Sequence, residues 1–181
     1  SHLYVVGVDG QHQRELAPDL SLGWPDAIDV WSSDSRFLAS EVILDGQDRI
    51  MVADVVTGVG RVVTPFRLAA HDPLWSPDDH WIAFAKEADS VRSLAIIRAD
   101  GSGMRTVSGN LVNVGGPDTW SPDGKWIYFG VDSGRVYRAN VAGGFTERLT
   151  GDDLGAYAPA SSPDGTLIAF IVDQRTVKYP L

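Results

Sequence analysis

Short runs of apolar residues recur along the whole chain, separated by turns rich in Gly, Pro and Asp. The runs contain many aromatic and β-branched residues, as in Lys125–Phe129, and such residues favour buried strands. A second run follows and leads into a Gly-containing turn, as Leu94–Ala99 leads into Asp100-Gly101. A shorter run comes next, such as Arg105–Val107. The pattern predicts antiparallel strands joined by hairpins, with almost no helix.

One motif occurs four times and divides these strands into repeats. The four copies align without gaps, and their starts are separated by 44, 45 and 41 residues. A period in the forties made of short strands is typical of propeller blades with about four strands each. The first copy has lost both the Pro and the Gly of the motif, and the last copy has lost the Trp. The copies are Trp31-Ser-Ser-Asp-Ser-Arg-Phe-Leu-Ala, Trp75-Ser-Pro-Asp-Asp-His-Trp-Ile-Ala-Phe, Trp120-Ser-Pro-Asp-Gly-Lys-Trp-Ile-Tyr-Phe and Ser161-Ser-Pro-Asp-Gly-Thr-Leu-Ile-Ala-Phe.

The residues of the motif have distinct structural roles. Ser-Pro-Asp-Gly predicts a turn, because Pro fixes φ, Asp bonds back to its own backbone and Gly accepts a positive φ. The Trp that precedes the turn recurs at one repeat position, so we expect it to pack between blades rather than to form a sugar platform. Two further tryptophans alternate in the next strand and are predicted to belong to the inter-blade core. These residues are Trp31, Trp75 and Trp120, then Trp81 and Trp126.

The full repeat resembles a known family. Trp-Ser-Pro-Asp-Gly-Lys-x-Ile-x-Phe, followed by a strand ending in Asp-Gly and by an Arg-Leu-Thr-like strand, is similar to the repeat of TolB-type propellers. The same repeat occurs in the propeller domains of prolyl oligopeptidase-like and tricorn-like peptidases. The resemblance covers nearly the whole chain and implies an all-β propeller of four-stranded antiparallel blades. It is specific for the fold and says little about function.

We interpret residues 1–181 as a single propeller domain of about four blades. Residues 3–16 match the third and fourth strands of a repeat, and residues 157–172 match the first and second. Pairing of these two half-blades would close the ring and remove two sheet edges. Because residues 175–179 also fit the start of a third strand, a larger ring, a ring of two chains and a fragment of a longer ring stay open. The complete blades are predicted at about 27–64, 71–107 and 115–150.

Composition and charge exclude several classes of protein. The chain of 181 residues is 44% hydrophobic and 22% charged, which is typical of a globular protein. Its net charge of −9 argues against nucleic acid as a partner, and its apolar runs are too short to span a membrane as a helix. With no Cys, the chain has no disulfide, thiol nucleophile or thiolate metal site.

Motifs for catalysis are missing from the sequence. Neither Gly-x-Ser-x-Gly nor His-Glu-x-x-His occurs. Gly101-Ser102-Gly103 precedes a predicted strand rather than a helix, so it indicates a turn and not a phosphate-binding loop. None of the four histidines has a metal-ligand spacing: His2, His12, His71 and His80. We therefore expect no catalysis by this chain, unless the parent protein carries a catalytic domain.

Candidate binding residues lie on the loops that precede the first strand of each blade. Such loops converge on one rim over the central channel, where propeller ligands commonly bind. Trp24 lies outside the repeat, so we expect it to be exposed. The predicted rim set is Trp24, Asp26, His71, Asp72, Asn113, Asp118, Asp152, Asp153 and Tyr157. The loops between the second and third strands add Asp45, Asp48, Glu87, Asp89, Asp132 and Asp173 to the same rim.

The acidic rim has two interpretations. A funnel of carboxylates would attract cations or basic peptides, and its oxygens could hold Ca²⁺ or another cation in the channel. The alternative is that Asp simply belongs in exposed turns. No Asp-x-Asp-x-Asp-Gly calcium loop is present, and the sequence predicts no other cofactor.

Three functional hypotheses follow. The leading one is a non-catalytic binding scaffold that presents its loop face and funnel to a protein or peptide. The second is the propeller of a prolyl oligopeptidase-like or other hydrolase whose catalytic domain is absent, and the third is a carbohydrate-binding or lyase-like propeller. The resemblance to TolB-type proteins implies a periplasmic or secreted location. Either a monomer or a homodimer is compatible with the repeats.

Overall fold

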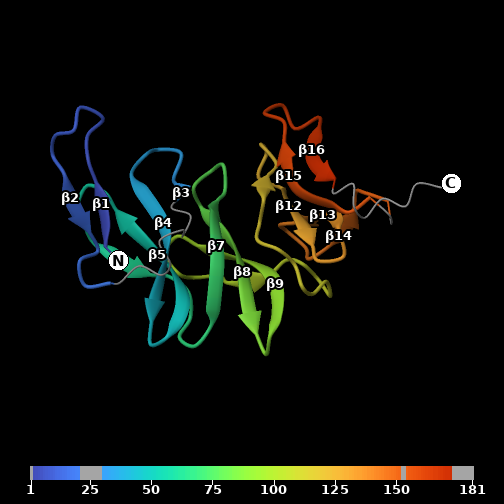
Figure 1. Cartoon of the computed structure of the whole chain (residues 1–181), viewed down its shortest axis with the longest axis horizontal. Coiled ribbons are helices and arrows are strands. Elements are labelled where there is room, and N and C mark those ends of the chain that lie inside the picture. Colours follow the sequence, from blue (N-terminus) through green and yellow to red (C-terminus); the bar gives the residue numbers. More distant parts are fainter. Residues whose placement is uncertain (1, 21–29, 152–153, 173–181) are drawn as a thin grey trace.

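The computed structural model describes residues 2–20, 30–151 and 154–172. Within these residues the chain forms sixteen strands and no helix. Twelve of the strands make three complete sheets, each antiparallel and with its strands in sequence order (Figure 1). Blade 1 contains β3 (Val30–Trp31), β4 (Phe37–Leu44), β5 (Gln47–Asp54) and β6 (Gly60–Val62). Blade 2 contains β7 (Ala69–Trp75), β8 (Trp81–Ala88), β9 (Val91–Arg98) and β10 (Arg105–Thr106). Blade 3 contains β11 (Thr119–Trp120), β12 (Trp126–Val131), β13 (Arg135–Asn140) and β14 (Thr146–Arg148).

Two half-blades complete the described fold, and they do not pair with each other. β1 (Leu3–Val5) pairs with β2 (Arg14–Leu16), and β15 (Ala156–Ser161) pairs with β16 (Ile168–Val172). The two hairpins lie at opposite ends of the row of sheets (Figure 1). Among the described residues, the predicted closure of four blades is thus corrected to an open arc of a propeller, because each hairpin packs on the blade next to it in sequence and forms a two-stranded sheet of its own.

The core consists of apolar clusters between adjacent sheets. Strand alternation sends neighbouring residues to opposite seams. In β8, Ile82 and Phe84 face blade 1, whereas Ala83 faces blade 3. We call the junction of blades 1 and 2 the first seam, that of blades 2 and 3 the second seam, and that of blade 3 with β15 and β16 the third seam. The N-terminal hairpin contributes Leu3 and Leu16 to a further cluster against blade 1.

Tryptophans of the repeat link the complete blades. The indole Nε1 of Trp75 donates to the carbonyl of Val30 at 3.0 Å, and that of Trp120 donates to the carbonyl of Leu74 at 3.2 Å. Both side chains are buried, which agrees with their predicted packing role. Trp31 departs from this pattern, because it is 49% exposed.

The serine and aspartate of the repeated turn explain why the motif survives without Pro and Gly. Ser32 Oγ donates to Asp34 Oδ1 at 2.7 Å and accepts from the Phe37 N–H at 2.9 Å. The same pair of bonds joins each of the other serine turns. Ser35 takes the positive φ that Gly124 takes in blade 3. Ser and Asp thus hold the turn even in the degenerate first copy.

Replacing Trp120 with Phe tests the link between blades 2 and 3. The Trp120→Phe variant leaves the Leu74 carbonyl without its donor and removes part of a buried ring, so we expect a loss of about 2 kcal/mol in the free energy of unfolding. The matched Trp31→Phe change, at an exposed ring, is expected to cost under about 0.5 kcal/mol. Urea denaturation measures both, and equal losses would contradict the role assigned to the link.

Candidate functional site

The structure separates the predicted rim residues into different environments. His71, Asp72, Asn113, Asp118 and Tyr157 are described, whereas Trp24, Asp26, Asp152 and Asp153 lie outside the described residues, as does Asp173. Asp118 and Tyr157 share one pocket. His71 and Asp72 instead meet residues of blade 1. The described rim residues thus fall into two neighbouring groups, because Asp72 also lies against Gly116 of the pocket wall.

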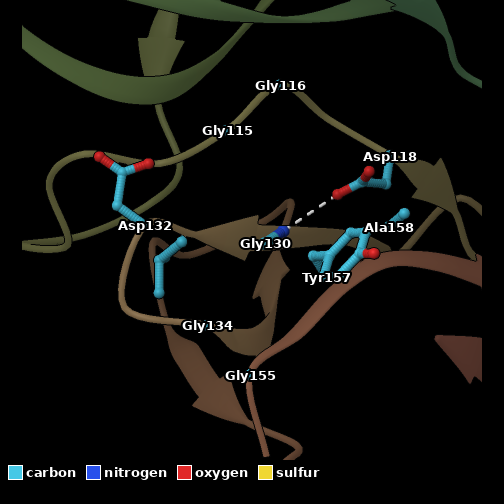
Figure 2. Close-up of a pocket in the computed structure, with 10 residues that line it drawn as sticks. Gly115, Gly116, Asp118, Gly130, Asp132, Gly134, Gly155, Tyr157 and Ala158 are labelled. Atoms are coloured by element: carbon cyan, nitrogen blue, oxygen red, sulfur yellow. Dashed lines mark hydrogen bonds between the residues drawn. The ribbon is translucent and has the colours of Figure 1, made fainter. Parts of the chain in front are cut away.

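A pocket of about 460 Å³ lies at the rim of the third seam, where the β12–β13 hairpin meets β15 (Figure 2). Half of its lining residues are glycines, so much of its wall is bare backbone. Figure 2 shows Asp118 and Tyr157 on the same side of Gly130, whereas Asp132 lies on the opposite side of the view. The lining residues are Gly115, Gly116, Asp118, Gly130, Val131, Asp132, Gly134, Gly155, Tyr157 and Ala158.

Close approach of two backbones requires one of these glycines. Gly134 has a φ of 72°, and a Cβ on it would lie 2.8 Å from the Cα of Gly155. The Ala156 N–H donates to the Gly134 carbonyl at 2.7 Å, which holds the hairpin against β15. Gly130 is less confined, because its Cβ would lie 3.8 Å from the Cα of Tyr157. Gly134 thus permits the close approach of the two backbones, and Gly130 leaves space in the pocket.

Asp118 is one of the ionisable residues that line this pocket. Its Oδ2 accepts from the Gly130 N–H at 3.0 Å. Burial raises the pKa of Asp118 to about 6, with a further contribution from the Asp72 carboxylate, although the Gly130 bond works in the opposite direction. A carboxyl group that titrates near neutral pH thus lies beside the exposed ring of Tyr157.

His71 and Asp72 occupy a bulge in β7 at the first seam. The register shifts between His71 and Leu74, and Asp72 has a φ of 55°. Nδ1 of His71 lies 3.6 Å from Glu41 Oε2 and 3.9 Å from Asp48 Oδ2. The Asp72 N–H donates to Glu41 Oε1 at 2.7 Å. This bulge therefore connects blade 2 to two carboxylates of blade 1.

The charged groups at the first seam shift one another's pKa values. The Glu41 carboxylate raises the pKa of His71 despite partial burial of the ring. Burial favours a higher pKa for Glu41, but its bonds with His71 and the Asp72 N–H outweigh burial and lower that pKa. Burial, together with the charge of Glu41, raises the pKa of Asp72. His71 and Glu41 thus stabilise each other's charged forms.

Several residues of these seams were not predicted from the sequence. Glu41 lies within a strand, but it was visible as a charged residue at the repeat position where the sister blades have Ala85 and Gly130. Gly130 also carried a signal, because glycine is unfavourable within a strand.

The predicted rim residue Asn113 lies beside the pocket and does not line it. Asn113 has a positive φ, and its carbonyl accepts from the Asp132 N–H at 3.2 Å.

Neither a metal site nor a membrane helix is found in the described part of the chain. Residues 2–20, 30–151 and 154–172 contain no group of three or more His, Cys, Asp or Glu side chains placed to hold a metal ion. The predicted channel cation therefore has no candidate ligand set among them. No helix of these residues is long and apolar enough to cross a bilayer.

Consecutive four-stranded antiparallel sheets, packed face to face through apolar seams, define a β-propeller protein. The PD40 family model, described as the TolB beta propeller domain, matches residues 1–179. The chain therefore belongs to the TolB β-propeller domain family. A search of curated proteins found no match.

Solved structures with the same fold include two TolB proteins. The chain is 22% identical to a TolB of Agrobacterium tumefaciens, with a TM-score of 0.73 over 97% of this chain and 64% of that one. For TolB from Acinetobacter baumannii the identity is 22% and the TM-score 0.66, over 93% and 42% of the two chains. Oligogalacturonate lyase from Vibrio parahaemolyticus is 18% identical, with a TM-score of 0.66 over 92% and 52%. The chain thus spans less than two thirds of each of these proteins, and the likeness shows the fold alone.

Alanine substitutions distinguish the two pocket glycines. Gly134→Ala introduces a Cβ at a positive φ and against the Gly155 backbone, so we expect a loss of at least about 2 kcal/mol in unfolding free energy. Gly130→Ala makes only ordinary contacts and is expected to cost under about 1 kcal/mol. Thermal and urea unfolding compare the variants. A costly Gly130→Ala with a tolerated Gly134→Ala would refute the geometry of the third seam.

The His71–Glu41 pair predicts a pH dependence of stability. Because the pKa of His71 is raised above 6.5, its contribution is complete below that pH and is lost as the pH rises through the folded-state pKa. Because the pKa of Glu41 is lowered below 4.5, its contribution is lost as the pH falls through the folded-state value. The stability difference between the wild type and His71→Gln should therefore be largest between these pH values and shrink toward about pH 8. Thermal unfolding across this range measures the difference, and a difference that does not change with pH would rule out the pairing.

Proposed function

We propose that this protein is a non-catalytic binding scaffold whose third-seam pocket holds a short segment of a partner protein or peptide. The observation that carries this proposal is the lining of the pocket. Its ten residues are five glycines, two aspartates, one tyrosine, one valine and one alanine. This set supplies surfaces and hydrogen-bonding groups but no nucleophile paired with a base, which favours binding over chemistry.

A glycine-lined wall suits recognition of a polypeptide. Without side chains, a segment of a partner can approach the backbone N–H and C=O groups of the seam closely. The Tyr157 ring, 46% exposed, supplies an aromatic surface of the kind that anchors partner residues. Strand pairing holds β12 with β13 on one side of the pocket and β15 with β16 on the other, so these walls are ordered before the partner arrives.

The other two hypotheses remain separate proposals with their own support. A propeller domain of a hydrolase is compatible with the repeat, and the discriminating observation is a hydrolase domain in the parent gene. The fold likeness to oligogalacturonate lyase favours a carbohydrate ligand. A glycan array without binding would remove that candidate. For location, we propose export from the cytoplasm, on the basis of membership of the TolB family.

Filling the pocket provides the test of peptide binding. A random peptide library is selected on the wild-type protein, and the selected peptides are then measured on Gly130→Leu, whose side chain occupies the pocket. We expect affinities at least about tenfold weaker on this variant. The matched control is Ala142→Leu, which adds the same apolar group to an exposed turn outside the pocket and is expected to bind like the wild type. Selected peptides that bind Gly130→Leu as tightly as the wild type would contradict the proposal.

A further inference from the structure

Three repeat positions face one another across each seam at this rim. The first pairs with the third strand of its blade: Glu41 with Ile50, Ala85 with Leu94, and Gly130 with Val136. The second position lies in the same blade, two residues before the third-strand residue that pairs with the first position. The third position lies on the next blade, four residues before the first residue of its repeated motif. The resulting trios are Glu41, Asp48 and His71 at the first seam, Ala85, Arg92 and Gly116 at the second, and Gly130, Gly134 and Tyr157 at the third.

At the first seam these positions are filled by the chain itself. The imidazole of His71 lies between the carboxylates of Glu41 and Asp48. Glu41 also accepts from the N–H of Asp72. Two carboxylates of blade 1 and the imidazole of His71 from blade 2 thus fill the rim of this seam.

The second seam is also occupied from within. A Cβ on Gly116 would lie 2.6 Å from the Cβ of Asp72, so the Asp72 side chain takes the space that this glycine leaves. The positive charge of Arg92 acts on Asp72 and lowers its pKa, in opposition to burial. A partly buried carboxylate is again influenced by a basic side chain of the same protein.

Among the described residues that line the pocket at the third seam, a carboxylate is present without a basic group. Asp118 lies in the pocket, and Tyr157 stands at the position of His71. Both carboxylate positions of the first seam are glycine here, which creates the hollow. None of the ten lining residues is Lys, Arg or His.

We infer that the third-seam pocket binds a cationic group of the partner, an ammonium, guanidinium or imidazolium, which pairs with the Asp118 carboxylate and lies against the Tyr157 ring. This inference rests on the proposed function and adds the chemical class of the ligand. The partner's cation takes the place that His71 fills at the first seam. The occupied seams of the same molecule thus show what the empty one lacks.

Physical chemistry supports a cation at this position. Asp118 is partly withdrawn from water, so an ion pair there is screened less than one on the open surface. An aromatic ring attracts a cation over its face, and this chain already places the Arg138 guanidinium 4.2 Å from the centre of the Trp126 ring. The net charge of −9 draws cationic segments toward the protein.

Three blocked pentapeptides of alanine test this inference, with Lys, Gln or Glu at the central position. Backbone amide NMR shifts of Gly130, Gly134 and Gly155 report binding in the pocket. We expect the Lys peptide to bind at least about tenfold more tightly than the Gln peptide, and the Glu peptide to bind least. Lys binding should weaken from about pH 7.5 to about pH 5, because Asp118 becomes protonated.

Two variants that each remove one negative charge test whether the preference for the Lys peptide comes from Asp118. Asp118→Asn should reduce Lys affinity to the level of the Gln peptide. Asp89→Asn, on an exposed hairpin of the same rim outside the pocket, should leave it unchanged. Equal binding of the Lys and Gln peptides at the pocket glycines would overturn the cationic class and leave the proposed function standing. If no peptide shifts these amides and the library selection also fails, both the inference and the proposed function are wrong.

Discussion

The hydrogen bond from an indole N–H to a main-chain carbonyl of the preceding blade holds the complete blades in register. Trp75 and Trp120 each bury a large ring in a seam, where the indole N–H needs a partner once water is excluded. Arginines of the fourth strands add a second link at the other end of each sheet, because Arg61 donates to the Ala99 carbonyl at 2.6 Å and Arg105 to that of Val141 at 2.7 Å. The complete blades are thus linked through both their first and their fourth strands.

Both links are replaced at the third seam. Ser161 stands where the motif has Trp, and Glu147 stands at the position of Arg61 and Arg105. Glu147 accepts instead from Arg138 of its own blade at 2.6 Å. The whole cross-strand row changes with them: blade 2 presents Leu74, Ala83 and Ile96, whereas blade 3 presents Thr119, Tyr128 and Arg138. A largely polar row thus faces the third seam, and the pocket lies at the rim of the same seam. Departure from a repeat is where function is expected.

Local chemistry made most of the fold predictable. Ser76 and Asp78 form their turn by contacts within six residues, so the motif alone is enough to define it. Closure of the ring was not predictable in this way, because it depends on the sum of turns between sheets. The pocket was also hidden, since it arises where the Gly134 hairpin meets Gly155, residues far apart in sequence. Asp118 and Tyr157 were expected on the rim, but only the seam shows that they act together.

The same kind of loop residue has opposite roles at different seams, and the residue across the seam decides which. His71 and Tyr157 occupy equivalent bulges in β7 and β15. Opposite His71, the carboxylate of Glu41 completes a pair inside the protein. Opposite Tyr157, Gly130 leaves open space beside a carboxyl group that has no lining cation. An acidic residue at a propeller rim is therefore interpretable only together with its neighbour on the next blade. In this chain the basic neighbour of Glu41 completes a pair within the fold, whereas the inferred ligand would complete the pair with Asp118.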